Sequence, residues 1–156
     1  MHSRIFKVQP DQTQEFSEIK EEDYYDNGFL DGYHDYVAAL DAEETKDAYL
    51  WLGSKSNLYK VKEEKDGHFY VEITKESILE QVEAMWERLK KEIRKPLNQR
   101  SIWSANNSLS DTSGFYFELG GCYFTEGEFL EELLKYHIKD QDVLSFRLEG
   151  ALDYHC

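Results

Sequence analysis

The chain has 156 residues, of which 40% are hydrophobic and 32% charged, and its formal net charge is −14. These values predict one globular domain over residues 1–156, able to bury about 70% of the surface that its unfolded form exposes. The acidity argues against direct binding to nucleic acid, and no apolar run of about eighteen residues suggests a membrane span. With only two cysteines and no signal-peptide pattern, we expect a cytoplasmic protein.

Residues 11–52, which we call the acidic segment, carry most of the negative charge. They contain thirteen acidic residues, two lysines and eight aromatic residues. Disordered acidic segments are poor in aromatic residues, because a chain with little to bury cannot offset the entropy of ordering. The composition therefore predicts that the acidic segment is folded and presents carboxylates and tyrosines on its surface.

The first strand is predicted at residues 5–8, because the proline at position 10 lacks the backbone donor that a sheet needs. Within the acidic segment, Phe29, Tyr33, Tyr36, Val37 and Leu40 recur at helical spacing and predict a helix. The next residues, 41–44, have the spacing of a helix capping box. Residues 42–52 fit a helix or a strand equally well, and the sequence leaves that choice open.

A hairpin is predicted at residues 59–73, where two alternating segments flank Asp66 and Gly67. A helix should follow, capped by Thr74 and ended before Pro96, with an apolar stripe on one face. Its charges run from acidic to basic, which is the order that the helix dipole favours. The dipole thus explains most of a basic cluster that leads toward Trp103 and that would otherwise suggest a phosphorylated ligand. The cluster is Arg88, Lys90, Lys91, Arg94, Lys95 and Arg100.

Residues 96–113 form a long polar stretch, and loops of this length are usually functional or disordered. A strand is predicted at 115–119, a bulge at Gly120 and Gly121, and a helix through residue 138 with a capping box of Thr125 and Glu128. Alternating apolar residues predict a last strand at 144–148. These elements indicate an α+β single domain with a largely antiparallel sheet and two to four helices packed mainly on one face.

The candidate binding surface lies within the acidic segment. Carboxylates one helical turn apart can imitate a row of backbone phosphates, and tyrosines beside them supply rigid contact area. The sequence therefore favours a non-catalytic protein of the inhibitor or immunity type, which engages a basic protein partner through residues 21–47. A surface that only keeps the protein soluble would have the same composition. The candidate contact residues are Glu21, Glu22, Asp23, Tyr24, Tyr25, Asp26, Asp31, Tyr33, Asp35 and Tyr36.

Two other classes of function remain as alternatives. Cys122 precedes a predicted helix start and could be a nucleophile in a small-molecule or peptide enzyme, with a cleft formed near residues 96–113. Free cysteines are, however, usually buried apolar residues, and that is the expectation for Cys122. The other alternative is a structural subunit that forms a homo-oligomer through an apolar sheet surface.

The sequence predicts neither a cofactor nor a metal site. No phosphate-binding glycine loop or dinucleotide fingerprint occurs. Asp23, Asn27 and Gly28 match positions of a calcium-binding loop, but Tyr25 and His34 stand where that loop needs oxygen ligands. His34 with one neighbouring carboxylate is short of the three or four ligands that zinc takes.

Overall fold

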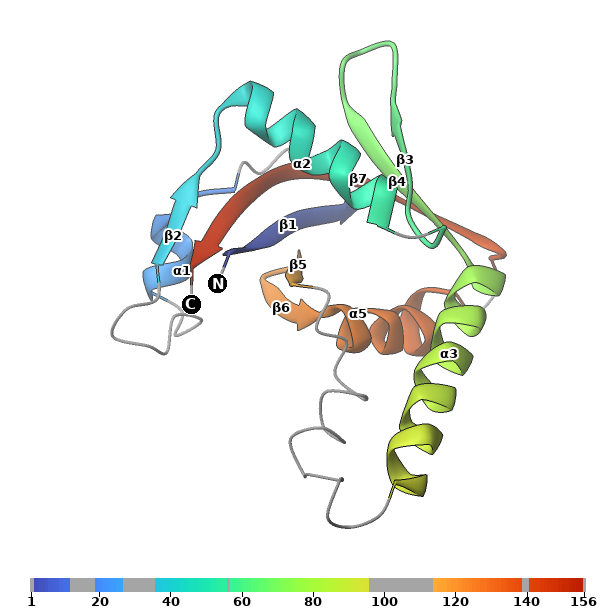
Figure 1. Ribbon diagram of the computed structural model, residues 1–156. Coiled ribbons are helices and arrows are strands. Elements are labelled where there is room, and N and C mark those ends of the chain that lie inside the picture. The colour runs from blue at the N-terminus through green and yellow to red at the C-terminus, as the bar shows by residue number, and fades with distance from the viewer. Residues whose placement is uncertain are drawn as a thin grey trace.

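A computed structural model describes residues 2–11, 19–26, 36–55, 57–95, 114–138 and 141–155. Within these ranges seven strands form one sheet in the order β3-β4-β7-β1-β5-β6, and β2 also pairs with β7 (Figure 1). All strand pairs are antiparallel except β1 with β5. The predicted α+β class with a largely antiparallel sheet is confirmed. The strands are β1 (His2–Pro10), β2 (Tyr36–Ala39), β3 (Lys60–Glu63), β4 (Phe69–Thr74), β5 (Phe115–Leu119), β6 (Cys122–Thr125) and β7 (Val143–His155).

The long strand β7 organises the sheet. One edge of β7 pairs with β1, whereas its other edge pairs with β4 in the first half and with β2 in the second. The register with β1 shifts between Lys7, opposite Gly150, and Val8, opposite Leu148, so Glu149 is the extra residue of a bulge. The bulge lies where neither β4 nor β2 covers the outer edge of β7.

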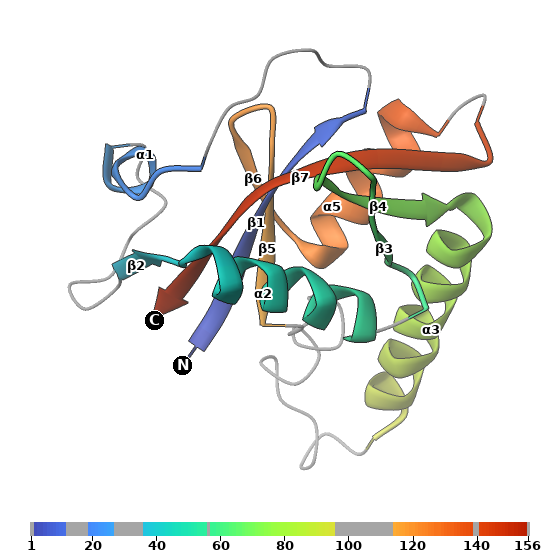
Figure 2. The same ribbon diagram turned by 90° about the horizontal axis from the view of Figure 1, so that it is seen from above.

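The core consists of two clusters of buried side chains. The larger includes Phe6 and Val8 of β1, and the smaller includes Ile5, because successive side chains of a strand point to opposite faces of the sheet. The larger cluster also takes side chains from β4, β5, β7 and three helices. These helices are α2 (Ala42–Lys55), which runs across β1 and β7 in Figure 2, α3 (Lys75–Arg94) and α5 (Glu126–Glu132). Among the helices in the described residues, α1 (Glu22–Asp26) alone contributes to the smaller cluster, so these helices pack mainly on one side as predicted.

The predicted helix signals are confirmed by hydrogen bonds. Thr74 caps α3, and Thr125 with Glu128 forms the capping box of α5. α5 continues into a π-helical turn, η1 (Leu133–His137), in which the Ile138 amide donates to the Leu133 carbonyl at 3.0 Å. Residues 42–52, which the sequence left open, belong to helix α2.

Two predictions about local structure are wrong. Residues 36–39 form strand β2 rather than part of a helix, because their backbone pairs with the end of β7. The rest of that predicted helix, residues 29–35, lies outside the described residues. Gly120 and Gly121 form a two-residue hairpin turn rather than a bulge, since Leu119 pairs directly with Cys122. Both glycines have positive φ, 61° and 80°, as such turns require.

Asp41 is expected to stabilise the protein through the cap of α2. Its Oδ1 accepts the amides of Glu43 and Glu44, both at 2.9 Å, and the Glu44 side chain accepts the Asp41 amide at 3.0 Å. Asp41→Ala should lower the free energy of unfolding by about 1 kcal/mol in urea titrations. The control Glu43→Ala, in the same turn, should change it by less than about 0.5 kcal/mol. Equal losses in the two variants would contradict the capping role.

Candidate functional site

The acidic segment is held to the sheet by Tyr24 of α1. This side chain is fully buried, and its hydroxyl donates a hydrogen bond to Oε2 of Glu118 at 2.8 Å. Its ring lies 4.9 Å from that of Tyr123. Burial, and then the negative charge of Glu118, raises the pKa of Tyr24 well above its usual value. Tyr24 therefore faces the interior, and we leave it out of the contact surface that the sequence predicted.

Glu118 also faces a lysine across the parallel pair of β1 and β5. The Lys7 Nζ lies 3.6 Å from Oε1 of Glu118, and the two side chains are only 10% and 9% exposed. A buried carboxylate needs such partners, because desolvation of an isolated charge is very costly. The sequence did not single out Lys7 or Glu118, since the partners lie far apart along the chain.

Three further contacts fix the residues around α1. Gly150, in the bulge of β7, leaves room for Ile19, because a Cβ on Gly150 would lie 2.9 Å or less from two of its side-chain atoms. A Glu21 carboxylate oxygen accepts the amide of Ala39 in β2, and the Tyr25 hydroxyl donates to the Val37 carbonyl at 3.4 Å. The residues around α1 are thus joined to both β2 and β7.

The outer side of α1 and β2 carries several of the predicted contact residues. Glu22 and Asp23 are exposed, and Tyr25 and Tyr36 are 52% and 45% exposed. The Tyr36 ring stacks on His155 at 4.2 Å, which holds it in one orientation. Asp26 ends α1. Asp31, Tyr33 and Asp35 lie outside the described residues.

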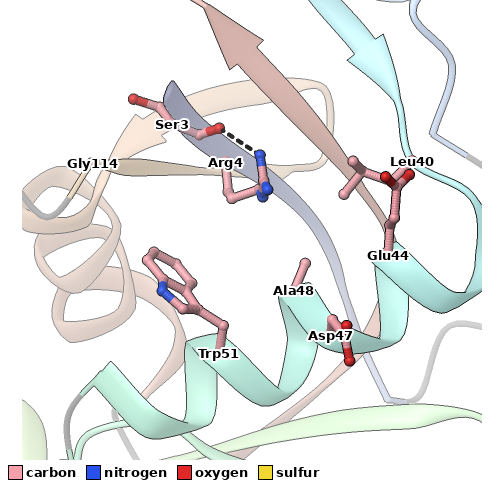
Figure 3. A pocket seen from close by; sticks show the side chains of 8 residues that line it. All are labelled: Ser3, Arg4, Leu40, Glu44, Asp47, Ala48, Trp51 and Gly114. Carbon is pink, nitrogen blue, oxygen red and sulfur yellow. Dashed lines mark hydrogen bonds between the residues drawn. The ribbon is translucent and has the colours of Figure 1, made fainter. Parts of the chain in front are cut away.

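Helix α2, which packs on the opposite face of the sheet from α1, is also acidic and forms one wall of a pocket of about 540 Å³. Four of its residues recur at helical spacing and therefore share one side of the helix: Glu44, Asp47, Ala48 and Trp51. Figure 3 shows these side chains together with Ser3 and Arg4 of β1, Leu40 and Gly114, which complete the lining. The spacing was visible in the sequence, but it indicated a pocket only once residues 42–52 were known to be helical.

The electrostatics of this pocket favour a cation. Arg4, its basic lining residue, already forms an ion pair with Asp153, so the carboxylates of Glu44 and Asp47 leave an excess of negative charge. Trp51 is only partly buried and packs near Phe6 and Phe115 in the core. The Lys55 Nζ already lies 4.5 Å from the centre of a Trp51 ring, and aromatic faces attract ammonium and guanidinium groups.

The other candidates from the sequence are placed as follows. Cys122 is exposed at the start of β6, so the expectation that it is buried is wrong, because the hairpin turn projects this end of the strand toward solvent. Its proposed cleft partner, residues 96–113, lies outside the described residues. Arg88, Lys90, Lys91 and Arg94 are exposed on α3, as is Lys95 directly after it.

Searches for metal sites and relatives identify nothing further. Across the described ranges, no three His, Cys, Asp or Glu side chains come together in a way that could hold a metal ion. In that same part of the chain, no helix combines the length and apolar character needed to cross a membrane. No family model, curated protein or solved structure matches the chain.

Proposed function

We propose that the protein acts by binding a basic protein partner, without catalysis, through the acidic surface of α1, β2 and α2. The observation that carries this proposal is the pocket beside α2, where Glu44, Asp47 and the aromatic side chain of Trp51 line the same wall. Such a pocket suits a lysine or arginine side chain, since carboxylates pair with its charge and an aromatic ring supports its apolar stem. An inhibitor or immunity-type role toward a basic nucleic-acid enzyme fits this surface.

Exposed carboxylates on α1 and near the start of α2 would guide the partner toward the pocket. Asp41, which caps α2, and Glu43 in its first turn are exposed, as are Glu22 and Asp23 of α1. Charges of one sign raise the association rate of an oppositely charged partner, and salt screens this effect. Tyr25 and Tyr36 would add rigid contact area at the edge of the surface. The proposal also places the protein in the cytoplasm, which its two cysteines support.

Two double variants, each of which loses two negative charges, test whether the partner binds at the pocket. Glu44→Gln with Asp47→Asn removes both carboxylates of the pocket, while glutamine keeps an acceptor for the capping box of α2. Glu64→Gln with Glu131→Gln removes two exposed carboxylates elsewhere. A protein captured from native lysate by the wild type is identified, and its binding to all three proteins is measured by surface plasmon resonance.

We expect the pocket variant to bind at least about tenfold more weakly, and the control variant to stay within about twofold of the wild type. The association rate should fall as ionic strength rises. Equal effects of the two variants would show that only net charge matters. An association rate that is unaffected by salt would contradict electrostatic guidance.

A further inference from the structure

Helix α3 carries a line of apolar side chains that are each more than half exposed. Leu79, Trp86 and Ile93 are 51%, 55% and 54% exposed and recur every seven residues, so they lie along one line of the helix. The domain instead buries Ile78 and Leu89, on an adjacent side. Figure 1 shows α3 extending away from the sheet.

The line has the seven-residue spacing of one position in a coiled coil. Val82 and Leu89 lie three residues after Leu79 and Trp86, on the side of α3 that faces the domain, where Val82 is half-buried and Leu89 is buried. The exposed line therefore borders the covered side of the helix. Monomeric proteins rarely expose an apolar row of this kind without a use.

The distribution of charge along α3 indicates which partner would cover the exposed apolar line. Residues 75–84 carry three acidic side chains and one basic one, whereas residues 85–94 carry four basic and two acidic ones. A second copy of α3 in parallel orientation would place like charges together. In antiparallel orientation the acidic half of each helix faces the basic half of the other, which is favourable.

We propose that two copies of the chain associate through α3, antiparallel, about a twofold axis at Trp86. Trp86 is the midpoint between Leu79 and Ile93, so this axis would bring each Leu79 against Ile93 of the partner subunit. Glu83 would then lie near Lys90 of the partner subunit. A twofold interface is self-complementary, so each such contact occurs twice. This surface is separate from the acidic surface of α1 and α2.

The length of α3 determines how large the dimer interface can be, and hence how strongly the two copies should associate. Twenty residues of helix span about 30 Å, and a face about 12 Å wide would bury on the order of 700 Å² in total. This lies below the size of most stable interfaces, so we expect a reversible dimer with a dissociation constant in the micromolar range. The internal pairs of Lys90 with Glu87 and of Lys95 with Glu92 are exposed and weak enough to rearrange.

Sedimentation velocity of the full chain from about 5 to 500 µM tests the dimer. The wild type should pass from monomer to dimer over this range, and Trp86→Gln should weaken dimerisation at least about tenfold. Leu50→Gln, which removes an equally exposed apolar side chain from α2, should leave it unchanged. A wild type that stays monomeric at every concentration, or a dimer insensitive to Trp86→Gln, would overturn the proposal.

A charge exchange tests the orientation. Glu83→Lys and Lys90→Glu should each weaken the dimer several-fold, and the double variant should restore it. The two residues are seven positions, about 10 Å, apart on the same helix, so they cannot pair within one chain. Recovery therefore requires a second, antiparallel copy, and failure of the double variant to recover would exclude this arrangement. Circular dichroism verifies that every variant is folded.

Discussion

Glu118→Ala should lower the free energy of unfolding by about 3 to 5 kcal/mol, because it removes the carboxylate from a buried pair. The Lys7 ammonium would stay in a site where its side chain is 10% exposed, and the Tyr24 hydroxyl would lose its acceptor. Urea titration followed by circular dichroism measures the loss. A change below about 1 kcal/mol would show that the pair is solvated and that it does not anchor α1.

Two companion variants separate the contributions to this loss. Lys7→Met with Glu118→Leu removes both charges, so its remaining cost should come mainly from the lost hydrogen bond of the buried Tyr24 hydroxyl to Glu118, about 1 to 3 kcal/mol. Tyr24→Phe removes only the hydroxyl that donates to Glu118, and it should cost about 1.5 to 3 kcal/mol. If the double variant were as unstable as Glu118→Ala, the isolated charge of Lys7 would not explain the effect.

Elements with local signals were predictable from the sequence. The hairpin of β3 and β4 follows from Asp66 and Gly67, and the helix starts at Thr74 and Thr125 follow from side chains within four residues of them. These signals depend on backbone geometry over a few residues, so contacts with distant parts of the chain do not change them.

Elements that depend on distant partners were not predictable. β2 is a strand because Val37 pairs with Tyr154 of β7, more than a hundred residues away, although the helical spacing of its residues is equally good. The Gly120 turn differs from a bulge only in the register of β5 with β6. The contact of Tyr24 with Glu118 and the grouping of Arg4 with Trp51 likewise require the folded sheet.

The stability of the protein should fall steeply above pH 10, because two buried tyrosines resist ionisation. Burial raises the pKa of Tyr24 and the pKa of Tyr49 above their usual value near 10, and in each case a buried carboxylate, Glu118 or Glu149, raises it further. Below pH 10 both groups are neutral in the folded and the unfolded chain, so their contribution to stability is fully present. Above pH 10 only the unfolded chain releases these protons, which favours unfolding.

Each tyrosine should therefore remove about 1.4 kcal/mol from the free energy of unfolding by pH 11, and the two together about 3 kcal/mol. Urea titrations at pH 8, 9, 10 and 11 measure this loss, and absorbance at 295 nm reports the ionised tyrosines. Tyr24→Phe should roughly halve the loss between pH 9 and pH 11, although it lowers stability at pH 8. Tyr25→Phe, at the exposed position beside it, serves as the matched control. If both variants kept the wild-type dependence on pH, ionisation of Tyr24 in the folded protein would be unhindered and α1 would not be docked on the sheet as described.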